Sequence, residues 1–544
     1  MDNYNLQREE IERVYGKVSP FELKDRLINL AKESEESGVH SLLDAGRGNP
    51  NWIAATPREA FFTFGQFAVE ESRRVWSDND LGGMPQRLGI AHRFVDFLNR
   101  NERAPGIRLL RKMINYGVTI KGFEADEWIH ELANGIIGDN YPQPDRMLKH
   151  IESVVHDYLI QELCYNEPLE RKFDLFAVEG ATAGMCYIFD SLIANNILSK
   201  GDKIAIMAPI FTPYLEIPHL PRYNFEVVEL LAQEAAENGT HRGQYSFSEL
   251  EKLCDSSIKA LFIVNPSNPP SVAMEPGIVK HLKEVVEKHN PDLMIISDDV
   301  YGTFVDDFHS LMADLPYNTI GVYSFSKYFG VTGWRLGTIA LYENNVFDKL
   351  LRELDSNKRG RARKRYAALS TNPEEIPFID RIVADSRQVA LNHTAGLSTP
   401  QQVQMAFFAL FSLVDKDNRY KKLTKSICYR RQKLLFEGLG LKLSKDPFSA
   451  AYYTQFDLLE WAKNNYSEEF ADYLKNNYRL IDVLLKLAEE SSIVLLSGSG
   501  FHGPEWSIRI SLANLSDESY SKIGKVIRKI LEDYAGDWKK LQDQ

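Results

Sequence analysis

The stretch SFSKYFGVTGWRLG, residues 324–337, decides how the fold is interpreted. It follows the apolar run TIGVY, so Lys327 is expected just beyond a buried strand, among small hydroxyl residues and glycines. Apolar surroundings favour a nucleophilic lysine, and glycines let the backbone approach a phosphate. The stretch therefore predicts a lysine that forms a Schiff base rather than a surface lysine in a flexible loop. Arg335, in GWRLG, favours this interpretation.

Short apolar runs on both sides of this stretch predict further strands. Helical patterns such as IVKHLKEVVEKH lie between several of them. Near-continuous apolar strands that alternate with helices indicate a buried, mostly parallel sheet, so the expected fold class is α/β. The runs lie at 203–207, 259–264, 292–297, 319–324 and 337–342.

The regions outside this sheet divide the chain further. After residue 400, helices alternate with isolated strands (AYYTQF, SIVLLS and WSIRISL), which predicts a second, smaller α/β domain. The expected units are an N-terminal arm with part of the small domain at 1–52, a helical insertion at 53–140, the large sheet domain at 141–354, an inserted or linking segment at 355–399 and the C-terminal small domain at 400–544.

Composition excludes several classes of protein. With 44% hydrophobic and 26% charged residues among 544, the chain is expected to be a globular protein with a full core. Its net charge of −12 gives no general support for binding nucleic acid or an anionic membrane. The polar first residues, the lack of a long apolar run and four separated cysteines predict a reduced, cytoplasmic enzyme.

Three apparent motifs favour plainer interpretations. Gly498, Gly500 and Gly503 spell GxGxxG, but a proline and a strand follow, so a glycine-rich hairpin is expected instead of a dinucleotide site. The basic run at 358–365 is expected to be a solvated loop or a salt-bridge patch between subunits rather than a nucleic-acid contact. None of the 12 histidines has metal-binding spacing, so no metal is expected.

Five further motifs complete a pattern with residues 324–337. Taken singly, the first three could be a plain helix cap, a core phenylalanine and a proline-fixed turn. In this order they resemble the fold-type-I pyridoxal 5′-phosphate (PLP) enzymes of the aspartate aminotransferase superfamily. The motifs are GAT at 180–182, APIF at 208–211, NPSNPP at 265–270, DDVY at 298–301 and WSIRISL at 506–512.

This resemblance implies PLP as the cofactor, bonded covalently to Lys327 in the large domain. Asp298, rather than Asp299, would hold the proton on the pyridine nitrogen, which makes the ring an electron sink. Arg509 would clamp the substrate's α-carboxylate. The remaining residues implied to contact the cofactor are Gly180, Ala181, Thr182, Phe211, Asn268, Tyr301, Ser324 and Arg335.

Other features narrow the resemblance to the aspartate 4-decarboxylase branch, whose members also transaminate aspartate. They are the chain length, Arg47 before Gly48 in LDAGRGNPNW, Lys24 in SPFELKD, and the closing GSGFHGPEWSIRISLANL. The branch implies β-decarboxylation of L-aspartate to L-alanine and CO2, with transamination to 2-oxo acids such as 2-oxoglutarate as a side reaction. The alternative is a plain dicarboxylate aminotransferase with an insertion.

Three residues carry implied roles near the substrate or the partner subunit. A tight salt bridge to the β-carboxylate would oppose its loss, so Arg47 and Lys24 would bind substrate by steering that group without clamping it, unless they are surface or interface charges. Gly48 lies in the same substrate-binding segment. Tyr141 resembles the tyrosine that reaches the partner's cofactor phosphate, or else belongs to a proline-bounded turn. The resemblance implies a homodimer with shared sites, which could assemble further into a dodecamer.

Overall fold

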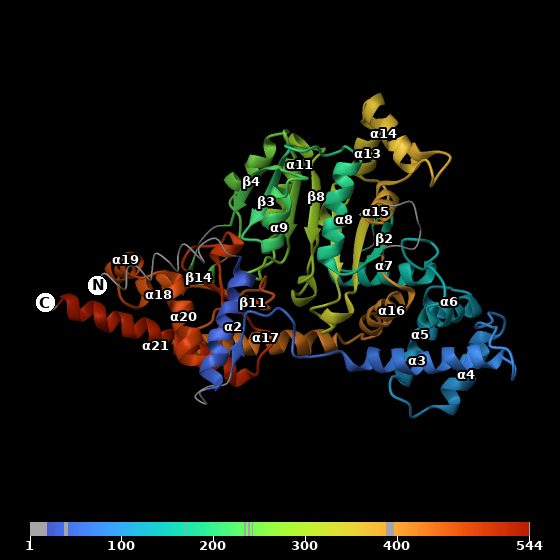
Figure 1. Cartoon of the computed structure of the whole chain (residues 1–544), viewed down its shortest axis with the longest axis horizontal. Coiled ribbons are helices and arrows are strands. Elements are labelled where there is room, and N and C mark those ends of the chain that lie inside the picture. The colour runs from blue at the N-terminus through green and yellow to red at the C-terminus, as the bar shows by residue number, and fades with distance from the viewer. Residues whose placement is uncertain are drawn as a thin grey trace.

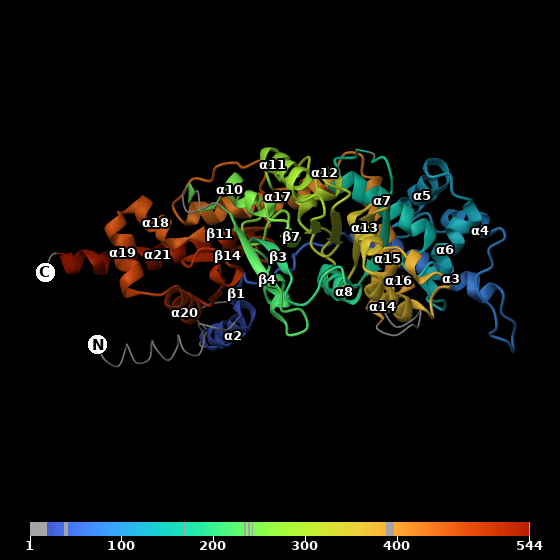
Figure 2. The same cartoon turned by 90° about the horizontal axis from the view of Figure 1, so that it is seen from above.

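The computed structural model places a large α/β unit between two flanking groups of helices (Figures 1 and 2). One group contains α3–α6, and the other, with α18–α21, surrounds a second sheet at the opposite end of the molecule. The residues that the structure describes are 19–36, 42–167, 169–232, 236–237, 240–241, 243–387 and 396–542.

A seven-stranded sheet forms the centre of the large unit. Its strands are parallel except β10, which is antiparallel to both of its neighbours, so the predicted mostly parallel sheet is confirmed. In spatial order the strands are β2 (Phe173–Val178), β10 (Gly337–Tyr342), β9 (Thr319–Ser324), β8 (Met294–Asp298), β7 (Ile258–Val264), β3 (Lys203–Ala208) and β4 (Glu226–Leu231).

Both faces of this sheet are covered, which explains the continuous apolar runs. Along β7, Leu261 and Ile263 join one core with α11 (Pro276–His289), whereas Phe262 joins another core and stacks on Phe189 of α8 (Ala181–Ala194). Successive side chains of a strand point to opposite faces, so a strand buried on both faces needs apolar residues at nearly every position.

Helices at one end of the molecule, four of them within the range 53–140, pack through aromatic side chains such as Phe64, Phe67 and Phe94. The structure differs from the expected boundary at residue 400, because α16 packs on α3, α6 and α7 rather than in the small unit. These helices are α3 (Ala55–Arg74), α4 (Ile90–Arg100), α5 (Ile107–Asn115), α6 (Ala125–Ile137), α7 (Lys149–Leu163) and α16 (Thr399–Leu413).

The small unit is built around a five-stranded sheet with its own core. The N-terminal segment contributes α2 (Pro20–Glu36) and β1 (Leu43–Asp44), which pairs with β12 (Ile493–Val494). The sheet strands are β13 (Leu496–Ser497), β14 (Ser507–Ser511), β11 (Tyr453–Asp457), β6 (Thr240–His241) and β5 (Ala236–Glu237). The surrounding helices are α17 (Arg419–Gly438), α18 (Leu458–Asn465), α19 (Glu468–Asn477), α20 (Leu480–Ser491) and α21 (Asp517–Gln542).

Two of the plainer interpretations can be compared with the structure. The glycines at 498–503 lie in a hairpin between antiparallel β13 and β14, as predicted. Of the two alternatives for the basic run, the loop is wrong, because residues 358–365 lie in helix α14 (Ser356–Tyr366), whose Arg363 and Arg365 pair with Glu374 and Asp385. The salt-bridge patch between subunits stays a prediction. Across the described ranges, no helix has the length and apolar character needed to span a membrane.

Candidate active site

A cavity of about 300 Å³ brings the predicted motifs together. It lies beyond the carboxyl ends of β8 and β9, where α/β sheets bind ligands, and β11, β14 and α2 complete its wall. Its lining consists of Phe21, Gly48, Asn49, Ala181, Thr182, Phe211, Val264, Asn268, Asp298, Val300, Tyr301, Ser324, Ser326, Lys327, Thr332, Arg335, Tyr453 and Arg509.

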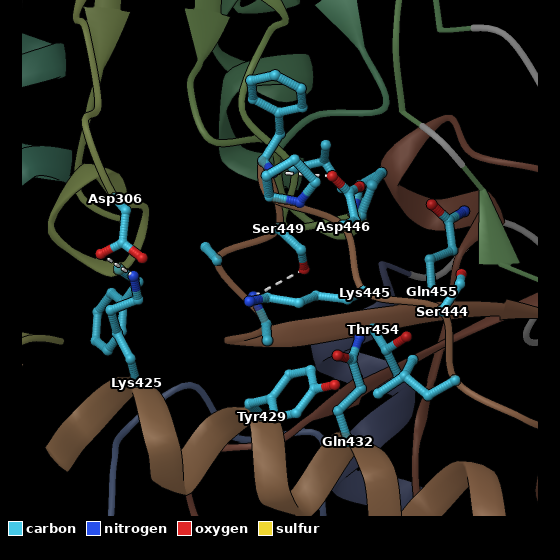
Figure 3. Close-up of a pocket in the computed structure, with 18 of the residues that line it drawn as sticks. Asp306, Lys425, Tyr429, Gln432, Ser444, Lys445, Asp446, Ser449, Thr454 and Gln455 are labelled. Carbon is cyan, nitrogen blue, oxygen red and sulfur yellow. Dashed lines mark hydrogen bonds and ion pairs between the residues drawn. The ribbon is translucent and has the colours of Figure 1, made fainter. Parts of the chain in front are cut away.

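A larger cavity of about 680 Å³ lies elsewhere and shares no lining residue with the first (Figure 3). Lys425, Tyr429 and Gln432 of α17 form one side, and the segment at 443–451 faces them. One of its two lysines, Lys425, is already paired with Asp306. Pro270 is the one described residue of the predicted motifs in its lining, and none of the predicted cofactor or substrate residues lines it, so size alone does not make it the candidate site.

An anion-binding cradle lies at the start of α8. The first N–H groups of a helix have no partners within that helix and favour an anion. Gly180 precedes this turn with φ of 88°, and a Cβ there would lie 2.7 Å from Nη2 of Arg335. The Ser324 hydroxyl donates to that of Ser326 at 2.9 Å on the same cavity wall. The cradle thus combines backbone donors, hydroxyls and a guanidinium, which together suit a phosphate.

The structure separates the roles of the two adjacent aspartates. Asp298 lines the cavity, where it accepts a 2.6 Å hydrogen bond from the Tyr214 hydroxyl. Burial raises the pKa of Asp298 to about 6, although Tyr214 and Lys327 oppose the rise. Asp299 instead accepts hydrogen bonds from Ser297 and Ser310 at 2.7 and 2.5 Å, outside the lining. Asp298 is therefore the carboxylate that a ligand in the cavity meets.

Lys327 reaches the cavity from the turn after β9. Its Nζ donates to the carbonyl oxygen of Gly48 at 3.0 Å, and the Tyr452 hydroxyl donates to the same oxygen at 2.8 Å. A Cβ on Gly48 would lie 3.0 Å from Nζ of Lys327 and 2.6 Å from Oη of Tyr453. Position 48 therefore needs a glycine, because a side chain there would crowd the lysine.

Arg509 is a buried cation that has no acidic partner among the described residues. Its side chain is 1% exposed, Nη2 donates to the Gly46 carbonyl at 2.8 Å, and Nη1 donates to Oδ1 of Asn268 at 3.4 Å. Nε has no hydrogen-bond acceptor. A buried charge without a counterion is costly, so this guanidinium is suited to a carboxylate ligand.

Two tyrosines lie between Arg509 and Lys327. The Tyr301 hydroxyl donates to that of Tyr453 at 3.1 Å, and the Tyr453 ring lies 4.3 Å from the Arg509 guanidinium. Burial raises the pKa of Tyr301 well above its usual range. Burial also tends to raise the pKa of Tyr453, but Lys327 and Arg509 outweigh it, so the net pKa is lowered.

Besides Gly180, which precedes the lining residues Ala181 and Thr182, three predicted residues lie outside this lining in the single chain. Nε of Arg47 lies 2.9 Å from Oδ2 of Asp44, and the Arg47 side chain is 59% exposed. Lys24 contributes its aliphatic stem next to Gly46, on the same helix as the lining residue Phe21. Tyr141 is 66% exposed at the surface.

Sequence reasoning missed three residues that the structure brings into or beside the site. Ser326 lies within the deciding stretch, and its place between Ser324 and Lys327 was a usable signal. Tyr214 follows Phe211 by one helical turn, so the two side chains could have been expected to lie on the same face and reach the same site. Tyr453 belongs to a distant strand, and no local motif points to it.

The cavity fits a phosphorylated aldehyde with a basic ring nitrogen, which is the chemistry of PLP. The cradle at Gly180 suits the phosphate, buried Asp298 suits the ring nitrogen, and the Lys327 amine suits the aldehyde. The ring would fit against Phe211, which lines the cavity together with Asn268. Arg509, which has no acidic partner among the described residues, remains for a substrate carboxylate. The site therefore has the character of an amino-acid-transforming enzyme.

The chain belongs to the family described as aminotransferase class I and II, whose model matches residues 169–527. It is 44% identical over 531 residues to a bifunctional aspartate aminotransferase and L-aspartate β-decarboxylase of a Pseudomonas species, covering 97% of this chain and 98% of that protein. A probable aspartate aminotransferase of Methanocaldococcus jannaschii is 26% identical over an aligned region that covers 44% of this chain and 59% of that protein.

Solved structures agree on the fold. The aspartate aminotransferase of Rhizobium meliloti matches with a TM-score of 0.58 at 15% identity, over 93% of this chain and 95% of its own. A double mutant of the Thermus thermophilus aspartate aminotransferase matches with a TM-score of 0.57 at 16% identity, and the match covers 93% of this chain and 96% of that chain. Family membership confirms the predicted PLP-dependent enzyme class.

Asp299 makes the stability of this fold depend on pH. Burial raises the pKa of Asp299 to about 7, so the folded chain retains a proton that the unfolded chain has released. Its contribution to the unfolding free energy is complete below about pH 4 and is lost as pH rises through 7, with a slope of up to about 1.4 kcal/mol per pH unit.

Asp299→Asn should therefore flatten the dependence of the unfolding free energy on pH between these values. Urea denaturation at several pH values would measure it, with exposed Asp78→Asn as the matched control. An undiminished slope in Asp299→Asn would contradict the assignment.

Proposed function

We propose that this chain is a PLP-dependent L-aspartate β-decarboxylase, which forms L-alanine and CO2 and also transaminates aspartate with 2-oxo acids such as 2-oxoglutarate. The observation that carries the proposal is the near full-length similarity to the bifunctional Pseudomonas protein. The buried guanidinium of Arg509, which has no acidic partner within the described part of the chain and lines the same cavity as Lys327, supports an amino acid as substrate. The test is product analysis with aspartate as the sole substrate.

Arg509 and Asn268 position the substrate. The planar guanidinium can bind the α-carboxylate through two parallel hydrogen bonds, which fixes the direction of the Cα–H bond. Aromatic rings of Tyr453, Phe501 and Phe21 surround the guanidinium and exclude water, so the charge pair is strong.

Lys327 moves the first proton. With the cofactor bound, the Nζ atom would serve as the base for the substrate's Cα proton. Asp298 would keep a proton on the ring nitrogen, and the hydrogen bond from Tyr214 holds this carboxylate in place. When bound, the cofactor accepts the electron pair left by the broken bond at the substrate.

Arg47 distinguishes the two activities in this proposal. Its guanidinium projects from the segment that carries Gly48 and is paired with Asp44, so its charge is shared and cannot clamp a β-carboxylate fully. Such partial attraction can steer the carboxylate before C–C cleavage without stabilising it strongly.

Arg47→Ala should lower alanine formation from aspartate by about tenfold to a hundredfold, the equivalent of one charged hydrogen bond. Half-transamination, measured as formation of the pyridoxamine cofactor, should persist. Exposed Arg103→Ala is the control. An equal loss of both reactions would instead make Arg47 a general binding residue, and unchanged reactions would make it a structural charge.

We also propose a cytoplasmic homodimer with shared sites, which could assemble into a dodecamer and yield alanine in the cell. The exposure of Tyr141, outside the cavity of its own chain, supports a contact with the partner's cofactor phosphate. Four unpaired cysteines support a reducing compartment.

A further inference from the structure

Tyr453 places a hydroxyl beside the reactive lysine. It is the first residue of β11, is 2% exposed, and pairs in register with Ser511 of β14. Oη of Tyr453 and Nζ of Lys327 lie 2.6 and 3.0 Å from the point where a Cβ on Gly48 would sit. The two polar groups therefore face the same small volume of the cavity.

The hydrogen bond that Tyr453 accepts leaves its own O–H able to donate to a ligand in the cavity. Tyr301 donates to the Tyr453 oxygen at 3.1 Å, so that oxygen acts as acceptor and its own O–H is available to the cavity. A phenolate formed here would lie beside the cations of Lys327 and Arg509, whose guanidinium is 4.3 Å from the ring. The pKa of Tyr453 is accordingly lowered despite burial, which favours its use as a proton donor.

Loss of a β-carboxylate creates a demand for a second proton donor. Lys327 handles the proton at Cα, whereas the electron pair left by departing CO2 must be protonated at Cβ. Arg509 keeps its protons at all working pH values. Asp298 accepts its hydrogen bond from Tyr214 at the ring-nitrogen side of the cavity. Tyr453 is thus a hydroxyl that lies beside both the lysine and the carboxylate clamp.

We propose that the Tyr453 hydroxyl protonates the substrate's β-carbon after CO2 leaves, which makes Tyr453 a catalytic residue specific to decarboxylation. This proposal rests on the proposed function. The C–C bond to the β-carboxylate breaks and CO2 departs, a new C–H bond forms at Cβ with the Tyr453 proton, and the phenolate regains a proton from water as alanine leaves. No external oxidant or reductant is needed.

Tyr453→Phe tests the step, because it keeps the ring over Arg509 and removes only the hydroxyl. In single turnovers with aspartate, CO2 release should stay near the unmodified rate while alanine appears about 100-fold more slowly. Exchange of the Cα proton with solvent should be retained. Tyr429→Phe makes the same chemical change in the other cavity, and in this control CO2 and alanine should form at the same rate (Figure 3).

A second readout does not depend on catalysis. In a pH titration of the full chain without cofactor, tyrosinate absorbance should begin at a higher pH in Tyr453→Phe than in the unmodified protein or in Tyr429→Phe. An unchanged onset would overturn the proposal, because the hydroxyl would then lack the required acidity.

The turnover results separate the two proposals. If CO2 and alanine form at equal rates in Tyr453→Phe, the role of Tyr453 is overturned but the proposed function is not. Equal loss of CO2 release and Cα exchange would also overturn it, because Tyr453 would then be a positioning residue. No CO2 from the unmodified protein would overturn the proposed function and, with it, this step.

Discussion

Lys327→Ala should abolish both alanine formation and transamination, with a loss of at least about 10⁴-fold. Among the described residues that line the cavity, Lys327 alone carries a primary amine. The variant therefore lacks both the covalent attachment for the cofactor and the base for the Cα proton. Steady-state assays and the absorbance of the PLP-loaded protein would measure the two losses.

Chemical labelling provides the control for this prediction. Borohydride reduction of the PLP-loaded unmodified protein should fix the cofactor on the peptide that contains Lys327. Lys445→Ala, in the other cavity, should leave labelling and activity intact (Figure 3). Labelling of another lysine in the unmodified protein, or full activity in Lys327→Ala, would contradict the assignment.

Arg509→Leu should lower kcat/KM for aspartate by roughly 10³-fold, because two charged hydrogen bonds to the α-carboxylate are lost. Binding of PLP should change little, since Arg509 contacts Asn268 and Gly46 rather than the phosphate cradle. Initial rates against aspartate concentration, together with PLP titration, would measure both quantities.

Arg509→Lys refines the test of the carboxylate clamp. It keeps the positive charge but lacks the two-pronged geometry, so its kcat/KM should lie between those of the unmodified protein and Arg509→Leu. A loss in either variant that came entirely from weaker PLP binding would argue against a substrate contact.

The large sheet could be predicted because its central strands are buried on both faces. The run at 319–324 is apolar at nearly every position, and β9 occupies those same residues. Neither edge strand, β2 nor β4, was predicted, and in β4 several residues face solvent, which interrupts the apolar run. The basic helix α14 was missed because only Ala362 and Tyr366 are buried, which gives almost no apolar periodicity.

The candidate site could be predicted wherever a short motif carries its own chemistry. Lys327, Asp298 and Arg509 each stand in such a motif, and the fold brings them into one cavity. Tyr453 could not be found in this way, because its role depends on the pairing of β11 with β14. The direction of Arg47 also escaped prediction, since the ion pair with Asp44 is a feature of the folded segment.

The most direct test of the proposed function is the stoichiometry of products from L-aspartate alone, with PLP present and no 2-oxo acid added. The account predicts many turnovers in which CO2 and L-alanine appear in equal amounts. Product formation that stops after one equivalent of a 2-oxo acid per site, without CO2, would contradict it and would identify a plain dicarboxylate aminotransferase.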